Sequence, residues 1–325
     1  MTQKIDPMDI DKKITLISEV LPNFHSAMRR CDLCVRACKV DRTRGHKGFC
    51  RALDKARVYT YQAHHGEEPP ISGTNGSGTI FFSGCSMACV YCQNWQFSQK
   101  DKGEDVSDGE LAGIMLKLQD MGCHNINLVT PTHFIVNILE ALRDAYKKGL
   151  KIPVVYNTGG YDSKTHIEKL DRIVDIYLPD MRYSCDDNAV QYSKAPRYVE
   201  NNRSLIKEMY RQVGILNTDE NGVAKEGLIV RMLVLPGNIA GIIKNLEFIA
   251  ALDKNIPLSV MSQYRPVYKA KEDKVLSHGI KQDEYRLVLD KMKDLGLEAG
   301  WIQPMDEDFD PRFLGENFDK KIFTE

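Results

Sequence analysis

The chain has 325 residues, which suffices for one large α/β domain with a small appendage or for two modest domains. Hydrophobic residues make up 42% and charged residues 27%, and the formal net charge of -1 gives no reason to expect nucleic acid or an anionic membrane as a partner. No apolar run approaches the roughly 20 residues of a membrane span, and the N-terminus lacks the apolar core of a secretory signal. We therefore expect a cytoplasmic protein.

The first 78 residues show little regular pattern apart from a helical repeat of apolar residues at positions 10–21, before Pro22. The chain has nine cysteines, and in a reducing compartment metal ligation explains such a number better than disulfides do. Four of them form a complete set of thiolate ligands, which indicates a closed structural or electron-relaying site for zinc or an auxiliary iron–sulfur cluster. His46 could replace one ligand, and free buried thiols are the alternative. The four are Cys31, Cys34, Cys38 and Cys50.

A stretch with the composition of a loop, GEEPPISGTNGSG, occupies residues 66–78. We place a boundary there. The expected organisation is an N-terminal cysteine-rich extension at 1–78, a main domain at 79–305 and a C-terminal tail at 306–325.

Beyond residue 78, short apolar runs typical of buried strands alternate with amphipathic helical patterns. This alternation indicates a parallel sheet covered by helices. Six or seven such units predict an α/β fold of the partial (β/α)6 type, a TIM-like barrel with a small N-terminal metal-binding extension. Strands are expected at 79–82, 126–129, 152–156, 173–178, 228–235, 258–261 and 299–302, and helices at 107–121, 134–148, 164–171, 202–213, 239–252 and 282–295.

Three further cysteines directly follow the first barrel strand, in the motif Cys85-x-x-x-Cys89-x-x-Cys92. Thiolates are suited to iron–sulfur clusters, and three ligands leave one iron of a four-iron cluster free to bind something else. Catalytic groups of β/α barrels lie at the carboxyl ends of the strands, which is where this motif falls. Zinc held with a distant fourth ligand, or a buried apolar loop, are the alternatives.

This spacing, with an aromatic residue before the last cysteine, resembles the signature of the radical S-adenosylmethionine (SAM) superfamily. The wider sequence is similar to the group of pyruvate formate-lyase activating enzymes with an extra N-terminal cysteine cluster. The resemblance extends over most of residues 31–304 and is carried by GEEPPISGTNGSGTIFFSGCSMACVYCQNWQFS, INLVTPTHF, VVYNTGGYDS, IYLPDMRY, VRMLVLPG and SQYRP.

The resemblance implies a 4Fe-4S cluster whose open iron binds SAM, and reductive cleavage of SAM to a 5′-deoxyadenosyl radical that abstracts hydrogen from a substrate. The cofactors carry such chemistry, and the protein orients them and excludes side reactions. It also implies an electron donor such as flavodoxin or ferredoxin, with no nucleic acid or membrane as a partner.

The resemblance places candidate cofactor and catalytic residues after several strands. Thr130 and Thr132 lie where relatives carry a Gly-Gly-Glu segment that contacts the SAM amino group, and this chain departs from that pattern. His133, in the same loop, is a candidate acid or hydrogen-bond partner of the substrate, with local packing as the alternative.

The next loops continue the site. Asn157, Thr158, Gly159 and Gly160 loosely resemble an Asp-Thr-Asn-Gly run that faces SAM, although turn glycines are an equally simple reading. Asp180 matches the acid of an Asp-x-Lys element in which this chain has arginine; a helix cap is the alternative. Arg231 and Gln263 are further candidates for the same pocket.

Three functions remain open on the sequence. One is an activating enzyme that removes hydrogen from a backbone glycine of a partner protein. The second is a radical SAM enzyme acting on a small molecule or another protein side chain. The third is a metal-binding scaffold without catalysis.

Overall fold

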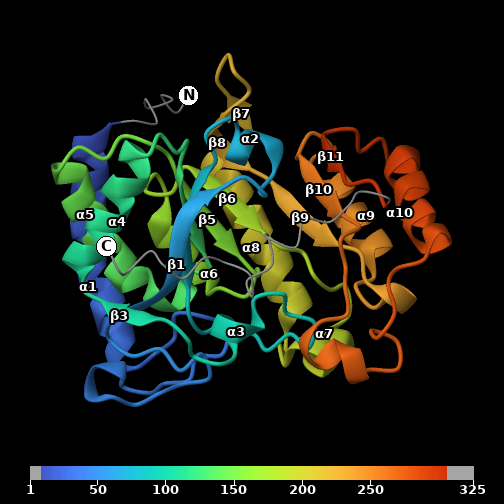
Figure 1. Ribbon diagram of the computed structural model, residues 1–325, viewed down its shortest axis with the longest axis horizontal. Coiled ribbons are helices and arrows are strands. Elements are labelled where there is room, and N and C mark those ends of the chain that lie inside the picture. Colours follow the sequence, from blue (N-terminus) through green and yellow to red (C-terminus); the bar gives the residue numbers. More distant parts are fainter. Residues whose placement is uncertain (1–8, 306–325) are drawn as a thin grey trace.

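The computed structural model describes residues 9–305 and shows a mixed α/β fold built on a parallel-rich sheet (Figure 1). The tail expected at 306–325 lies outside the described residues. The strands are β1 (Ala56–His64), β2 (Ser77–Phe82), β3 (Glu104–Val106), β4 (Ile126–Val129), β5 (Val154–Thr158), β6 (Ile176–Pro179), β7 (Asn217–Thr218), β8 (Ala224–Leu228), β9 (Val230–Leu233), β10 (Leu258–Met261) and β11 (Gly300–Ile302).

The strands form two sheets that meet at β8 and β9. The order is β3-β1-β2-β4-β5-β6-β8-β7 in the larger sheet and β11-β10-β9 in the smaller one. A bridge between Asp180 and Arg231 links the end of β6 to β9, so the parallel strands form one curved wall. This is the arrangement of a partial barrel, as the alternating pattern predicts.

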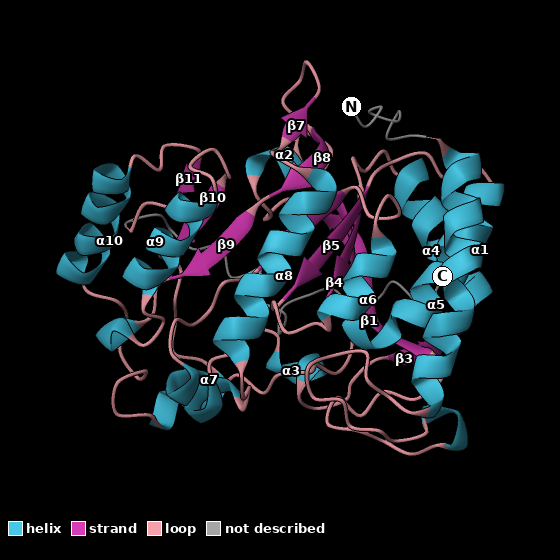
Figure 2. Ribbon diagram, turned by 180° about the vertical axis from the view of Figure 1, so that it is seen from behind, coloured by secondary structure: helices cyan, strands magenta, loops and turns pink. Residues whose placement is uncertain are grey.

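Helices cover the outer face of this wall, as seen from behind in Figure 2. Their apolar sides pack on strands that are buried along most of their length, which explains the continuous apolar runs of the sequence. They are α1 (Ile10–Arg29), α4 (Asp108–Asp120), α5 (Ile135–Lys147), α6 (Lys164–Ile167), α7 (Asp186–Ser193), α8 (Tyr198–Val213), α9 (Ile242–Leu252) and α10 (Gln282–Leu295), with the short α2 (Pro69–Ser72) and α3 (Trp95–Ser98).

The helix expected at positions 10–21 is present but longer than expected, and the expectation that the rest of residues 1–78 is irregular is wrong for one long strand. The helix α1 continues through Pro22 for a total of 20 residues. The strand β1 pairs antiparallel with both β2 and β3, and its residues Val58-Tyr59-Thr60-Tyr61 are of the β-branched and aromatic types that favour strands.

The N-terminal segment shares the core of the barrel. Ile17 and Phe24 of α1 are fully buried in the same apolar cluster as the barrel strands. Lys13 of α1 forms a buried ion pair with Asp175, which directly precedes β6, at 2.5 Å. The N-terminal segment is thus packed against the barrel, and the domain boundary at residue 78 remains a prediction.

The short helix α2 lies at the amino-terminal end of the barrel strands, opposite the loop that carries Cys85 (Figure 1). Ile71 of α2 is fully buried in a separate apolar cluster with Val155, Ile176, Leu178 and Ile229 of the barrel wall. This segment, which the sequence presents as a loop, therefore plugs one end of the barrel.

Within residues 9–305, none of the helices combines the length and apolar character that a membrane crossing demands.

Candidate functional site

The loop between β2 and α3, residues 83–94, carries Cys85, Cys89 and Cys92 and is called the cluster loop below. Each of the three sulfurs has a polar neighbour at hydrogen-bond distance. The backbone N–H of Met87 donates to Cys85 at 3.3 Å, and the hydroxyl of Ser193 donates to Cys89 at 2.9 Å. The Cys92 sulfur lies 3.2 Å from the hydroxyl of Ser98. Hydrogen bonds of this kind stabilise thiolates and tune the metal centres they hold.

The electrostatics of this loop favour a bound cationic centre. Burial raises the pKa of the Cys85 thiol and raises that of Cys92 to about 11, and the neighbouring cysteines add to the shift at both. The guanidinium of Arg182 acts in the opposite direction on both thiols. Three buried thiolates side by side need positive charge beyond one arginine, and iron ions supply it.

Among residues 9–305, no group of three or more His, Cys, Asp or Glu side chains is arranged so that it could hold a metal ion. The cysteine ligands of a four-iron cluster bind different irons, so they do not need to converge on one point. The donor types, their shared loop and their hydrogen bonds fit such a cluster.

The four N-terminal cysteines lie close enough together to interact. Burial raises the pKa of Cys34 to about 12, and Cys50, Cys31 and Cys38 each contribute to that rise. Gly48 packs against Cys38, whose sulfur would lie 3.1 Å from an added Cβ. We refer to residues 31–51 as the N-terminal cysteine segment.

Two arginines fasten this segment to the cluster loop and its surroundings. Arg36 donates to the carbonyl oxygens of Ser86 and Lys194, and Arg51 donates to those of Ser98 and Gln99. The two cysteine groups are also packed together directly, because a Cβ on Gly84 would lie 2.5 Å from the carbonyl oxygen of Cys50. The segment thus supports the outer side of the cluster loop.

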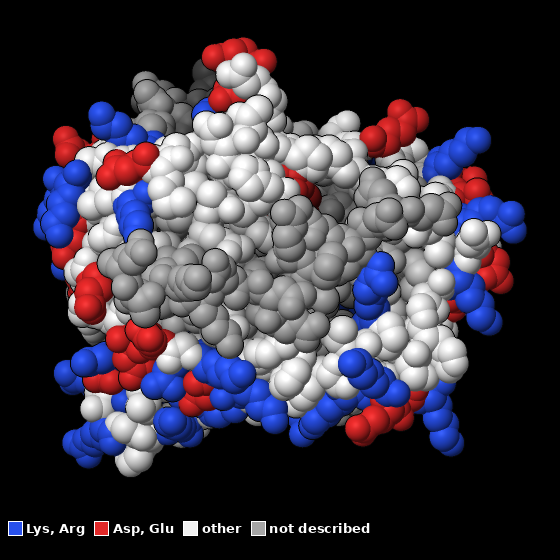
Figure 3. Space-filling model, viewed as in Figure 1, with Lys and Arg blue, Asp and Glu red and all other residues white. Residues whose placement is uncertain are grey.

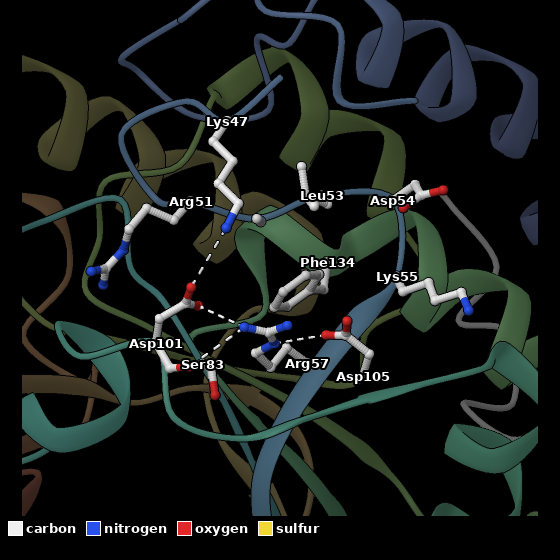
Figure 4. A pocket seen from close by; sticks show the side chains of 11 residues that line it. Lys47, Arg51, Leu53, Asp54, Lys55, Arg57, Ser83, Asp101, Asp105 and Phe134 are labelled. Atoms are coloured by element: carbon white, nitrogen blue, oxygen red, sulfur yellow. Dashed lines mark hydrogen bonds and ion pairs between the residues drawn. The ribbon is translucent and has the colours of Figure 1, made fainter. Parts of the chain in front are cut away.

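A small charged pocket of about 50 Å³ completes this attachment (Figure 4). The guanidinium of Arg57, on β1, lies between Asp105 at 2.6 Å and Asp101 at 3.3 Å. Lys47 of the N-terminal cysteine segment reaches the same Asp101 at 3.8 Å. The pocket is therefore occupied by its own ion pairs.

A second pocket, of about 240 Å³, opens onto Cys85 from the side of the N-terminal cysteine segment. Its lining includes Phe49 and Tyr268 and three cationic residues, Arg51, Lys194 and Lys269. On the face shown in Figure 3, Lys and Arg side chains gather along the lower edge, below the barrel. The surroundings of the cluster loop are therefore positively charged.

Inside the barrel, polar residues at the ends of β5 and β6 meet Arg231, which lies near the start of β9. Arg231 donates to Asp180 at 2.9 Å through Nε and to Asn157 at 2.6 Å through Nη2. Arg182 donates to the other oxygen of Asp180. Because Arg182 also influences the cluster thiols, this network connects β5, β6 and β9 to the cluster loop.

The threonines of the candidate site surround a buried carboxylate. Thr132 and Tyr156 donate to Oδ1 of Asp162, and Thr158 donates to Oδ2 at 2.6 Å. Thr130 has a φ of 59°, a left-handed conformation that is rare for a β-branched residue and is enriched at functional sites. The hydroxyls of Thr132 and Thr158 are thus engaged inside the protein, and their contacts with SAM stay a prediction.

His133 lies behind the cluster loop. Its Nε2 donates to the carbonyl oxygen of Ser83 at 2.7 Å, which leaves Nδ1 as an unprotonated and unpartnered nitrogen. Burial lowers the pKa of His133 to about 4. The ring is therefore neutral near pH 7 and positions the start of the cluster loop; a role toward substrate stays a prediction.

The remaining candidates line the same end of the barrel. A Cβ on Gly159 would lie 3.2 Å from the sulfur of Met87, and one on Gly160, which has a φ of 73°, would fall on the side chain of Asn202. Close approach thus requires glycine at Gly160. Shortly after β10, the carbonyl oxygen of Gln263 accepts a hydrogen bond at 3.4 Å from the side chain of Gln93, the residue that follows Cys92.

Several residues of this region had no signal in the sequence. Ser193 and Asp162 reach the site from distant segments, and only folding brings them to Cys89 and the threonines. Glu67 interacts with Arg231 at 3.4 Å from the far end of the barrel, although its sequence context is that of a surface loop. Arg182 could have been found, since it holds the place of the lysine in the Asp-x-Lys element.

Comparison with known proteins agrees with this geometry. A family model described as the Radical SAM superfamily matches residues 79–187, which span β2, the cluster loop and the strands to β6. The chain therefore contains a radical SAM superfamily domain. It is also 28% identical over 307 residues to the uncharacterized protein MJ0674 of Methanocaldococcus jannaschii, a match that covers 90% of this chain and 81% of that protein.

Proposed function

We propose that this protein is a radical SAM enzyme that holds a four-iron cluster on Cys85, Cys89 and Cys92. The observation that carries the proposal is the position of the three hydrogen-bonded thiols on the loop after β2, within the residues that match the superfamily. When bound, the cluster and SAM supply a reductive cleavage that yields a 5′-deoxyadenosyl radical for hydrogen abstraction.

The chain's own residues orient the cofactor and exclude water. Asp180 holds Arg231 and Arg182 side by side, and we assign these guanidinium groups to the carboxylate of SAM. Asn157 fixes the far side of Arg231. Thr130, Gly159, Gly160 and Gln263, together with Thr132 and Thr158, form the remaining wall of the proposed cofactor site.

For the substrate, we propose a backbone glycine of a partner protein, in line with the resemblance to activating enzymes. The described sheet has free edges at β3 and β11, which is compatible with lateral access of a polypeptide loop. A small molecule is the second candidate, because the interior of the barrel is polar and α2 closes its other end.

We also propose a second metal site at Cys31, Cys34, Cys38 and Cys50. Its support is the mutual proximity of the thiols, because Cys50, Cys31 and Cys38 all act electrostatically on Cys34. Metal analysis of the purified protein separates zinc from iron. Cys34→Ala should lower stability because structural metal binding is coupled to folding, while Cys185→Ala, at an exposed position, should not.

For the reductant, we propose an acidic electron carrier such as flavodoxin or ferredoxin. Arg51, Lys194 and Lys269 surround the pocket that reaches Cys85, so positive charge lies where an electron would enter.

The decisive experiment is anaerobic. The protein is reconstituted with iron and sulfide, reduced with dithionite and given SAM, and 5′-deoxyadenosine is quantified. We expect its formation in the wild type and in Cys185→Ala, and its loss in Cys89→Ala with the fold retained. Deoxyadenosine formation that survives replacement of each of the three cysteines refutes the proposal, and a scaffold without catalysis forms none in any variant.

A further inference from the structure

Two consecutive glutamates, Glu67 and Glu68, point into the barrel from the end opposite the cluster loop. They precede α2, whose Ile71 is buried in the apolar cluster with Val155, Ile176, Leu178 and Ile229. Glu68 occupies the N-cap position of α2 but makes no capping hydrogen bond with its side chain. Glu68 as a whole residue is 8% exposed, and the side chain of Glu67 is 9% exposed. These carboxylates are therefore buried without serving the helix that follows them.

The turn that presents them is rigid. The N–H of Glu67 donates to the hydroxyl of Ser72, and that hydroxyl donates back to the carbonyl oxygen of Glu67. Pro69 and Pro70 restrict the backbone, and Asn125 donates to the carbonyl oxygen of Ile71 at 2.7 Å. A rigid turn keeps the two carboxylates in place before any ligand arrives.

The carboxylates face residues from three barrel strands. Glu67 contacts Asn127 of β4 and Arg231 of β9, and Glu68 interacts with Ser259 of β10. Burial raises the pKa of both glutamates, and Arg231 opposes the rise. They thus line the interior of the barrel below the proposed SAM site.

Carboxyl groups outnumber guanidinium groups in this interior. Glu67, Glu68 and Asp180 are three carboxylates around Arg231, and Arg182 is the second guanidinium of the network. Arg231 already interacts with Asp180, Asn157 and Glu67. Arg182 keeps a buried Nε without a partner, but no hydrogen bond joins either guanidinium group to the second oxygen of Glu68.

Two buried oxygen atoms have no hydrogen-bond partner here: Oε2 of Glu68 and Oδ1 of Asn127. Asn127 is fully buried, and its side chain is directed at the acidic pair through Glu67. Both orphaned atoms are acceptors, and unpaired buried acceptors are costly. A group with several N–H donors would satisfy both atoms, and a positive charge on that group would suit the neighbouring carboxyl groups. Figure 3 shows a hollow between α2 and β10 with acidic side chains inside it.

We propose that Glu67, Glu68 and Asn127 bind a primary ammonium group inside the barrel. The inference rests on the proposed radical SAM function only in naming the source of such a group, which is an amine-bearing substrate. An ammonium has three donors, which suits a pair of carboxylates and an amide oxygen.

The test is a calorimetric titration of the reconstituted protein with n-butylammonium, in the absence of reductant. Neutral 1-butanol, of similar shape, is the matched ligand. We expect butylammonium to bind at least about tenfold more tightly than butanol, because a charged donor makes stronger hydrogen bonds to carboxylates than a neutral hydroxyl does. Equal affinity for the two ligands refutes the proposal without the use of any variant.

Variants locate the site. Glu68→Gln keeps the shape of the side chain and should lower the affinity for butylammonium about tenfold. Glu298→Gln, at an exposed position, should leave that affinity unchanged. A folded Glu68→Gln protein with unchanged affinity refutes the assignment. Undiminished binding beside unreduced SAM is expected of a substrate amine, whereas full competition by SAM refutes a separate ammonium site.

Failure of this inference is distinguishable from failure of the proposed function. A protein that forms deoxyadenosine but does not prefer butylammonium refutes the ammonium site alone. A protein that binds butylammonium through Glu68 but never cleaves SAM refutes the proposed function alone.

Discussion

The ion pair between Lys13 and Asp175 decides whether the N-terminal segment is part of the barrel or an appendage. The two side chains are 6% and 5% exposed, and the second oxygen of Asp175 also accepts from the N–H of Val154 at 2.8 Å. Lys13→Met keeps the apolar stem of the side chain and removes the charge. The substitution thus leaves a buried carboxylate that has one remaining donor.

Breaking a buried pair in this way costs about 3–5 kcal/mol. Because Val154 still stabilises Asp175, we expect a loss at the lower end of that range. The double variant Lys13→Met/Asp175→Asn removes both charges and should recover most of the loss. Lys39→Met is the matched control, since its partner Asp32 is exposed and such pairs contribute about 0–1 kcal/mol.

The free energies of unfolding are measured by urea denaturation of the four proteins under one set of anaerobic conditions. A loss of about 3 kcal/mol is a large part of the 5–15 kcal/mol that holds a typical domain together. If Lys13→Met is no more destabilising than Lys39→Met, the buried pair does not form and α1 is not joined to the barrel as described.

Two further predictions concern the cluster-loop side of the barrel. His133 has a pKa of about 4 when folded, below the value near 6.5 expected for the unfolded chain, so its contribution is present above about pH 6.5 and is lost as the pH falls toward 4. Unfolding by urea is measured from pH 7 to pH 4. The wild type should lose about 3 kcal/mol more stability over this range than His133→Gln does, and His278→Gln, at an exposed position, should behave like the wild type. Equal pH profiles of His133→Gln and the wild type contradict a neutral buried ring. Gly160→Ala should destabilise the protein by more than about 3 kcal/mol, because the added Cβ would overlap Asn202. Gly296→Ala, whose Cβ meets only an ordinary contact, should cost about 1–2 kcal/mol of backbone strain. Similar thermal midpoints for the two variants argue against the close packing at Gly160.

Much of this protein could be predicted from local sequence patterns. The strand and helix periodicities predict nearly all of the barrel elements, because residues buried on both faces of a parallel strand must be apolar over its whole length. The spacing of Cys85, Cys89 and Cys92 places three thiolates on one short loop whatever the rest of the chain does. The presence of a radical SAM domain rests on such local signals.

Other features depend on contacts between segments that are distant in the chain. The strand β1 escaped prediction because its apolar residues follow an irregular cysteine-rich stretch, and it becomes a strand by pairing with β2. Ser193 reaches Cys89 across 104 positions, and Arg36 reaches Lys194 across 158. No local pattern encodes which residues meet over such separations.

The acidic pair shows the division most clearly. In the sequence, Glu67 and Glu68 belong to a stretch with the composition of a surface loop, where two carboxylates would be solvated and without consequence. The sequence determines that a rigid, proline-bearing turn stands there. Only the tertiary structure inserts that turn into the end of the barrel, because burial of Ile71 in the apolar plug carries both carboxylates away from water and toward Arg231.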